Sequence, residues 1–383
     1  MKENQTHLNH RQQINLGSFY TPKKIVNLTY SLLQKNIGNI SNWTLLDSSC
    51  GYGSFLQTKT KRIIGADIDK IALDKAKNLI GNIKLFEMNS LKNVARENYN
   101  IHKNEKLIII GNPPYNDTTS IIRQNIKNIK TQNNIDQDIK TRDLGMSFLL
   151  SYNKLKADYI CVLHPLSYLI KKSNFNLLAK LTKNYQLIDG VIISSHEFSD
   201  TSKGMAFPIL IALYKRDNIG MNYDYIRNYK FQTKEGTTFC LNNFDTIANY
   251  ISKYPNKNYI SNTDKPIAKF YTMRDINALK RNRTFIDEDI TNAVYIVMDK
   301  LPYYCYVDVF KKYAEKLPYY LGNCDIIINQ EEFEKIKECF ISESVHNNPV
   351  LKKTFRFHDV PNATIKIENY FNKLLGEHLY ATN

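Results

Sequence analysis

A rigid strand ending carries the residues of this chain that are best suited to chemistry. The sequence "GNPPYND" spans residues 111–117 and directly follows the apolar run Leu107–Ile110. Pro113 and Pro114 fix φ at about −65° and cannot donate backbone hydrogen bonds, and Asn112 is held extended because a proline follows it. The strand must therefore end here, in a fixed arrangement of a side-chain amide, a backbone carbonyl and an aromatic ring.

This arrangement suits methyl transfer to an amine that is attached to an aromatic base. The lone pair of such an amine is delocalised into the ring, so the nitrogen is a poor nucleophile. The carbonyls of the Asn112 side chain and the Pro113 backbone can accept its two N–H groups, which favours a tetrahedral nitrogen with an available lone pair. Tyr115 offers a flat ring for the base to stack on. The motif holds no cysteine, which argues against covalent attack on a pyrimidine carbon; a merely rigid turn is the alternative interpretation.

Upstream strand endings predict a nucleoside-binding site. The sequence "LLDSSCGYGSF" (residues 45–55) places Asp47 at a strand end, before Gly51 and Gly53, which allow a tight turn and close approach to a ligand. Asp67 ends the next predicted strand, where a carboxylate can accept from two ribose hydroxyls. The glycines do not form G-x-G-x-x-G, so a nucleoside without phosphates, such as S-adenosylmethionine (SAM), fits better than a dinucleotide.

A third predicted strand ends in "LFEMNSL", residues 85–91. Its Asn89 can face the adenine edge of the same ligand. An ordinary turn residue is the alternative interpretation of Asn89, and the residue considered alone favours it.

An alternation of strands and helices up to about residue 215 must position these groups. Apolar runs of strand length lie at Trp43–Leu46, Arg62–Ala66, Ile83–Phe86, Lys106–Ile110, Tyr159–Leu163, Leu187–Ile193 and Pro208–Tyr214. Helical patterns include Lys23–Leu33, Lys70–Leu79 and Leu144–Leu155, and a further helix is expected after the glycine turn. Such alternation predicts a doubly wound, mostly parallel sheet with functional loops at the carboxyl ends of its strands.

The pattern changes near residue 216. Before that point, residues 116–143 form a polar segment that is too long for an ordinary connection, and such segments act as lids or binding loops or are disordered. After residue 216, tyrosines multiply and clean alternation fades. We therefore predict two domains, residues 1–216 and residues 217–383.

The positive charge of the chain is concentrated in its first part. The formal net charge is +15; residues 1–216 carry 30 Lys/Arg against 16 Asp/Glu, and residues 217–383 carry 22 against 21. Such a field favours a polyanion such as nucleic acid, although surplus lysine can also serve solubility. The six cysteines show no CxxC spacing, and we find neither a signal peptide nor an apolar stretch of about 20 residues, so a cytoplasmic protein is expected.

Taken together, these motifs resemble the N6-adenine DNA methyltransferases of bacterial type II restriction–modification systems, in the gamma-like subgroup whose cofactor motifs precede the catalytic motif. "GSFYTP" (17–22) looks like the upstream element that contacts the methionine end of SAM. "DSSCGYGSF", "ADID" and "NPPY" look like the glycine motif, the ribose-binding acid and the catalytic tetrad. "DLGMSFLLSYNKL" (143–155) and "DYICVLHPLSYL" (158–169) look like the next helix and strand, and the resemblance covers about residues 15–215.

The resemblance implies a fold and a set of functional residues. The fold is α/β: a class I SAM-dependent methyltransferase domain, Rossmann-like with a seven-stranded mostly parallel sheet, and a C-terminal α+β target-recognition domain. The catalytic residues implied are Asn112, Pro113, Pro114 and Tyr115. The SAM-binding residues implied are Tyr20, Thr21, Pro22, Asp47, Cys50, Gly51, Gly53, Asp67, Ile68, Asn89, Ser90 and Asn112.

The implied activity is site-specific methylation of adenine N6 in double-stranded DNA. The target base is flipped out of the helix and methylated by direct in-line transfer, without a metal, which protects the DNA from an endonuclease encoded separately. A monomer without membrane association is expected.

Some residues depart from the family pattern. Ser48 stands where a proline usually follows the acid, and Asn89 stands where the third strand usually ends in aspartate, which predicts weaker cofactor binding rather than its loss. The element that stacks an aromatic ring on the target base is poorly matched. We choose Phe198 for this role because Phe207 reads as part of the last strand; Phe198 can instead pack beneath its loop.

Other activities share the same tetrad. Enzymes that methylate the glutamine amide of release factors usually carry a helical domain before the glycine motif, whereas only about 40 residues precede it here. RNA adenine-N6 methylation and cytosine-N4 methylation of DNA remain open, because the tetrad requires only an exocyclic amine. A DNA-binding module on an inactive scaffold would need a damaged tetrad, and this one is intact. No PD…ExK nuclease pattern is evident after residue 216.

Overall fold

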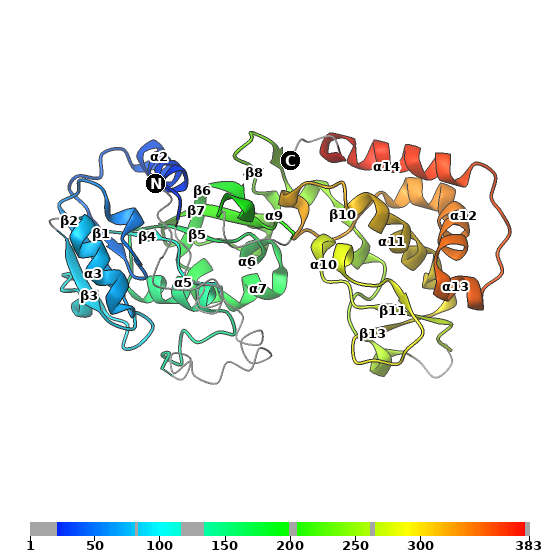
Figure 1. Ribbon diagram of the computed structural model, residues 1–383, viewed down its shortest axis with the longest axis horizontal. Coiled ribbons are helices and arrows are strands. Elements are labelled where there is room, and N and C mark those ends of the chain that lie inside the picture. Colours follow the sequence, from blue (N-terminus) through cyan, green and yellow to red (C-terminus); the bar gives the residue numbers. More distant parts are fainter. Residues whose placement is uncertain (1–20, 81–82, 116–133, 199–204, 261–264, 380–383) are drawn as a thin grey trace. The chain divides into compact units, whose positions relative to one another are not determined.

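The structure, a computed structural model, describes residues 21–80, 83–115, 134–198, 205–260 and 265–379 (Figure 1). It divides into two compact units, which meet in the chain between Phe239 and Cys240.

A seven-stranded sheet is the centre of the first unit. Its strands are β1 (Thr44–Asp47), β2 (Arg62–Asp67), β3 (Lys84–Glu87), β4 (Leu107–Gly111), β5 (Tyr159–Pro165), β6 (Tyr185–Ser194) and β7 (Pro208–Arg216). They lie in the order β3-β2-β1-β4-β5-β7-β6, and only β7 runs antiparallel to its neighbours. The predicted seven-stranded, mostly parallel sheet of the class I SAM-dependent methyltransferase fold is confirmed.

The central strands form because their sequences suit burial on both faces. Every residue of β1 and β4 is buried, and the four apolar residues of Leu107–Ile110 have no exposed surface. Continuous apolar runs of this kind are typical of parallel strands that are covered on both sides. β1 lies between β2 and β4, so the carboxyl ends of these three strands are neighbours.

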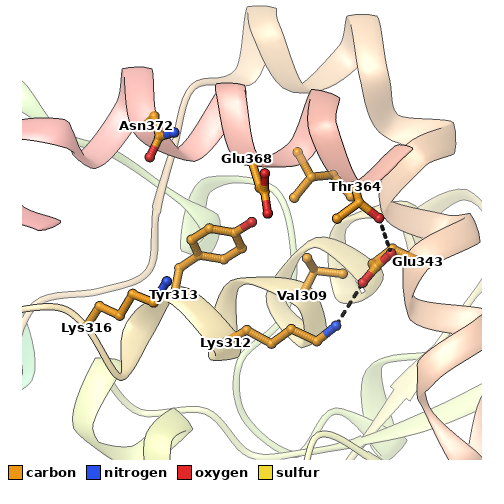
Figure 2. Close-up of a pocket in the computed structure, with 9 residues that line it drawn as sticks. Val309, Lys312, Tyr313, Lys316, Glu343, Thr364, Glu368 and Asn372 are labelled. Carbon is orange, nitrogen blue, oxygen red and sulfur yellow. Dashed lines mark hydrogen bonds and ion pairs between the residues drawn. The ribbon is translucent and has the colours of Figure 1, made fainter. Parts of the chain in front are cut away.

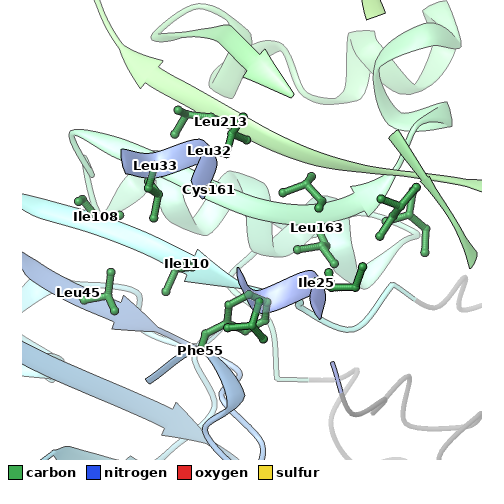
Figure 3. Packing of buried hydrophobic residues seen from close by; sticks show 14 of the residues in the cluster. Ile25, Leu32, Leu33, Leu45, Phe55, Ile108, Ile110, Cys161, Leu163 and Leu213 are labelled. Atoms are coloured by element: carbon green, nitrogen blue, oxygen red, sulfur yellow. The ribbon is translucent and has the colours of Figure 1, made fainter. Parts of the chain in front are cut away.

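Helices and short strands complete the first unit. They are α2 (Lys23–Ile37), α3 (Lys70–Leu79), α5 (Leu144–Lys154), α6 (Ser167–Ile170), α7 (Lys172–Leu177), α8 (Ala179–Thr182), α9 (Tyr223–Asn228), β8 (Phe231–Gln232) and β9 (Thr238–Phe239). α2 buries a stripe at helical spacing that includes Ile25, Leu32 and Leu33, against β5, β6 and β7. Figure 3 shows this stripe in one cluster with Ile110 and Leu163 of the sheet. Each such side chain contributes roughly 1.5–3 kcal/mol through burial.

The prediction of a helix after the glycine turn is wrong. Only a single 3₁₀ turn, Ser54–Leu56, follows the glycines. Residues 48–61 connect β1 to β2, and turns occupy residues 48–49 and 51–53, which leaves too short a segment for a longer helix. By contrast, α3 forms where predicted, because the Asp69 side chain caps its first turn by accepting from the N–H groups of Ile71 and Ala72.

The two units divide at Phe239 rather than at residue 216. Residues 217–239 pack on the sheet: the Tyr225 hydroxyl donates to Leu187 O (2.8 Å), and Lys234 N donates to Ile192 O (2.9 Å). Ile226 and Phe231 in this segment are fully buried. The loss of clean alternation after residue 216 therefore marks the end of the last long strand and not the end of the domain.

The second unit is built from helices and short antiparallel strands. Its elements are β10 (Asp245–Thr246), β11 (Ala268–Tyr271), α10 (Ile276–Arg281), β12 (Phe285–Ile286), β13 (Ala293–Ile296), α11 (Leu301–Ala314), β14 (Ile327–Ile328), α12 (Gln330–Asn347), α13 (Pro349–Thr354) and α14 (Ala363–Leu379). β11 pairs with β12 and β13, and β10 pairs with β14. The ring of Tyr306 on α11 contacts Phe333 and Phe340 of α12 and Phe371 of α14, which closes a predominantly aromatic core. This unit has the predicted α+β composition.

The position of the boundary can be tested with two fragments. A fragment of residues 1–239 should melt cooperatively, whereas one of residues 1–216 should melt about 10 °C lower, because it loses the burial of Ile226 and Phe231 on the sheet. Circular dichroism melts at equal concentration provide the comparison. Equal midpoints would show that residues 217–239 do not stabilise the first unit.

Candidate active site at the carboxyl ends of the strands

Four polar residues predicted from the sequence follow neighbouring strands of the sheet. Asp47 ends β1 and Asp67 ends β2, while Asn89 and Asn112 come just after β3 and β4. The order β3-β2-β1-β4 is continuous, and its pairs are all parallel. The sheet therefore brings these residues to one edge, as the alternating pattern predicts.

The glycine turn is tied directly to Asp67. One carboxylate oxygen of Asp67 accepts from Gly51 N (2.8 Å) and the other accepts from Asp69 N (3.0 Å). Gly51 and Gly53 have φ of 51° and 78°, a region that suits glycine, so the turn can close against the end of β2. Cys50 in this turn is buried, and burial raises the pKa of its thiol, so it is not a nucleophile.

Gly111 packs against the carboxyl group of Asp47. A Cβ at Gly111 would lie 2.7 Å from Asp47 Oδ1, and the φ of Gly111 is 146°. Both observations exclude a side chain at this position. Sequence reasoning missed Gly111 as a site residue; a glycine between the apolar run and Asn112 was the only signal.

The buried carboxyl group of Asp47 holds a proton at neutral pH. Its side chain is 2% exposed, and this burial, together with the negative charge of Asp67, raises the pKa of Asp47 to about 8. The backbone N–H of Ser49 donates to Asp47 Oδ1 (3.1 Å), which lowers the pKa of Asp47, but this effect is smaller than that of burial.

Asn112 presents a buried acceptor that is not used within the described structure. Its Nδ2 donates to Thr21 Oγ1 (3.3 Å), whereas its Oδ1 is buried and finds no hydrogen-bond partner among the described residues. An unsatisfied buried carbonyl costs roughly 1–3 kcal/mol, so this oxygen favours an incoming N–H donor. Pro113 is buried beside it, and Tyr115 is half-buried against the core cluster.

Asn89 acts as a turn residue in this structure. Its Oδ1 accepts from Leu91 N (3.0 Å) and its Nδ2 donates to Asn134 O (2.9 Å). The structure therefore agrees with the interpretation of Asn89 as an ordinary turn residue. Contact between Asn89 and the adenine edge of the ligand stays a prediction. The neighbouring Ser90 is buried, and Ile68, after Asp67, is 51% exposed.

The remaining predicted residues have different surroundings. Tyr20 lies outside the described residues, whereas Thr21 and Pro22 immediately precede α2. Phe198 is 4% exposed and belongs to the core cluster, which corresponds to packing beneath its loop. Phe207 packs partly against the same cluster. This burial weighs against base stacking by Phe198, a role that stays a prediction.

A separate pocket of about 400 Å³ occurs in the second unit (Figure 2). Its lining comes from α11, α12 and α14, and it contains none of the predicted site residues. Lys312 pairs with Glu343 (2.8 Å), which also accepts from the Thr364 hydroxyl (3.4 Å). Because these polar groups already satisfy one another, we do not assign the active site to this pocket.

Comparisons with known proteins agree with the motifs. Residues 6–180 match a family model described as N-6 DNA Methylase. The modification methylase CviBIII of Paramecium bursaria Chlorella virus NC1A is 25% identical over 187 residues, which are 49% of this chain and 47% of that protein. The match thus spans about half the length of this curated relative.

Solved structures with a similar arrangement are more distant in sequence. One is a type I restriction-modification system methyltransferase subunit from Streptococcus thermophilus, with 19% identity and a TM-score of 0.40, covering 59% of this chain and 48% of that one. Another is a putative class I S-adenosylmethionine-dependent methyltransferase from Listeria monocytogenes, with 16% identity and a TM-score of 0.39, covering 55% and 64%.

The first unit has the strand order of the class I methyltransferase fold, with one antiparallel strand, β7. The family match and the curated relative confirm the resemblance to N6-adenine DNA methyltransferases of the restriction–modification type. In the portions of the chain that the structure describes, no helix is long and apolar enough to cross a membrane.

The pKa of Asp47 predicts a specific dependence of stability on pH. Between pH 4 and pH 8 the folded carboxyl keeps a proton that the unfolded chain has lost, so the free energy of unfolding should fall as pH rises, by at most about 1.4 kcal/mol per pH unit. Asp47→Asn keeps the acceptor for Ser49 and does not titrate.

Denaturant unfolding at pH 5, 6, 7 and 8 tests this dependence. The stability of the Asp47→Asn variant should decrease less with pH than that of the wild type. Parallel curves would mean that Asp47 is already ionised in the folded protein.

Proposed function

We propose that this chain transfers a methyl group from SAM to the N6 amine of adenine in a specific sequence of double-stranded DNA. The observation that carries the proposal is the buried Oδ1 of Asn112, which has no hydrogen-bond partner among the described residues and lies at a strand end beside Pro113 and Tyr115. A preorganised acceptor of this kind is suited to an amine that must become more nucleophilic.

The residues at the strand ends fit SAM. Each carboxylate oxygen of Asp67 accepts one backbone N–H, which leaves lone pairs for two ribose hydroxyls. Exposed Ile68 offers an apolar surface for an adenine ring. The acidic group of Asp47 suits a positively charged ligand, because a nearby cation favours its ionised form. When bound, SAM supplies a methyl group activated by its sulfonium.

The tetrad then acts by positioning and electrostatics. The hydrogen bond from Asn112 Nδ2 to Thr21 orients the amide so that Oδ1 accepts from the target amine, and the Pro113 carbonyl accepts its second N–H. Tyr115 stacks on the base, which must leave the helix because its amine is otherwise out of reach. Neither acceptor is a strong base, so the proton released by the amine passes to solvent.

The distribution of charge supports DNA as the substrate. With the boundary at Phe239, the first unit carries 33 Lys/Arg against 19 Asp/Glu, and the second carries 19 against 18. We assign non-specific attraction to phosphates to the first unit and sequence recognition to the second. The proposed setting is a cytoplasmic monomer that protects DNA from a separate endonuclease.

Transfer of radiolabelled methyl from SAM to plasmid DNA, total RNA or release factor distinguishes the substrate classes. Single-molecule sequencing of DNA from a host that expresses the chain then identifies the base and its site. Modified N6-adenine in one recurring sequence is the expected result. Label in RNA, or at cytosine N4, would support one of the two alternative activities.

Asn112→Ala should reduce methyl transfer by more than about 100-fold, the scale of one preorganised electrostatic group, and leave SAM binding nearly intact. Thr21→Val is the matched control, because it removes the bond that orients Asn112 but keeps the acceptor, and it should cost less. Turnover assays with calorimetric titration of SAM measure both effects. Near-normal turnover of Asn112→Ala would contradict the proposed mechanism.

Asp67→Asn should weaken SAM binding at least tenfold with little change in the maximal rate. Hydrogen bonds to a charged group contribute roughly 1.5–3 kcal/mol each, and the variant can still accept from Gly51 through its amide oxygen. Asp69→Asn is the control, since Asp69 caps α3 and should not contact the ligand. Calorimetric titration measures the affinity of each variant for SAM. Equal SAM affinities for the Asp67 variant and the wild type would exclude the ribose contact.

A further inference from the structure

Tyr115 is in close contact with the first turn of α5. A Cβ at Gly145 would lie 2.9 Å from Tyr115 Cβ and 2.5 Å from the Tyr168 hydroxyl. Glycine at this position therefore lets two tyrosines meet the same turn of helix. Pro113 and Pro114 restrict the backbone that precedes Tyr115, and Gly145 contacts Tyr115 from elsewhere in the chain.

Asp143 fixes the start of α5. Its Oδ1 accepts from Gly145 N (2.9 Å) and from the hydroxyl of Tyr168. Its backbone carbonyl accepts from the Thr141 hydroxyl (2.6 Å). Burial, with a further contribution from the charge of Asp143, raises the pKa of Tyr115, so the Tyr115 phenol stays neutral. One carboxylate thus holds both the helix turn that contacts Tyr115 and the hydroxyl of Tyr168.

Tyr168 is buried and packs against His164 of β5. It is 2% exposed, and its ring stacks on His164, with 5.4 Å between ring centroids. Burial lowers the pKa of His164 to about 4, so the imidazole is neutral. Its Nδ1 donates to Pro165 O (3.0 Å), which leaves Nε2 to accept from the Tyr214 hydroxyl (2.7 Å). The Tyr168 ring is therefore supported by stacking on His164 of β5, a contact that does not involve the Tyr214 hydroxyl.

We propose that Tyr168 is a positioning residue for methyl transfer: through Asp143 and Gly145 it holds the first turn of α5 against Tyr115 and so fixes the ring on which the target base stacks. This inference rests on the proposed function. Tyr168 does not touch the reacting atoms; it determines how closely the base and the acceptors of the tetrad are aligned. Small errors in such alignment reduce turnover strongly, whereas binding of SAM depends on other strand ends.

Two hydroxyl deletions separate positioning from packing. Tyr168→Phe removes the bond to Asp143, and Tyr214→Phe removes the bond to His164; both keep their rings and both delete one buried hydroxyl. Steady-state methyl transfer to plasmid DNA gives kcat and the KM for SAM, and thermal unfolding gives stability. Tyr168→Phe should lower kcat about tenfold with KM for SAM within twofold. Tyr214→Phe should lose comparable stability while kcat stays within twofold.

Amide hydrogen exchange supplies a readout that does not depend on activity. In Tyr168→Phe, a peptide that covers residues 143–147 should exchange faster, because the Gly145 amide is held by Asp143. Asp143→Asn keeps an acceptor oxygen and should retain more kcat than Asp143→Ala. Unchanged exchange in Tyr168→Phe, or faster exchange with wild-type kcat, would overturn the proposal, as would an equal loss of kcat in Tyr214→Phe. Failure of the proposed function is distinct: the wild type itself would then label no DNA.

Discussion

The packing of Gly111 against the Asp47 carboxyl is the constraint on which the rest of the candidate site depends. β1 lies between β2 and β4, so Asp47 stands at the centre of the functional edge of the sheet. On one side, Ser49 N donates to Asp47 at the start of the glycine turn; on the other, Gly111, which immediately precedes the tetrad, lies against the Asp47 oxygen. A single buried carboxyl group therefore sets the spacing between the glycine turn and the Asn112–Tyr115 tetrad.

The site keeps polar groups in an unfavourable state within a well-packed unit. Asp47 is held neutral by burial, and the Oδ1 of Asn112 lacks a partner among the described residues. Both features lower the stability of the folded state. The fully buried strand Leu107–Ile110 and the face of α2 offset this through apolar burial. Polar groups left unsatisfied in an otherwise consistent fold are typical of functional sites.

Much of this arrangement could be predicted because it depends on local pattern and on one topological rule. Seven apolar runs became the seven strands, since runs of strand length between helical patterns form parallel sheets. Parallel strands share the edge at their carboxyl ends, so acids and amides that follow successive runs meet without any knowledge of side-chain contacts. Asp47, Asp67 and Asn112 were predictable in this way, and so was the turn at Gly51.

What the sequence did not reveal depends on contacts between residues far apart in the chain. The domain boundary lies later than predicted because residues 217–239, which lack clean alternation, form hydrogen bonds with the sheet and bury apolar side chains on it. The sequence leaves open whether Phe198 stacks on a base or packs beneath its loop, and its neighbours in the structure are core residues. The role of Gly145 is invisible for the same reason: a glycine inside a helical pattern is ordinarily a weakness, and only the closeness of Tyr115 and Tyr168 shows why it is needed. The residues proposed for the chemistry can therefore be predicted from spacing, whereas the residues proposed to position them are found only from packing.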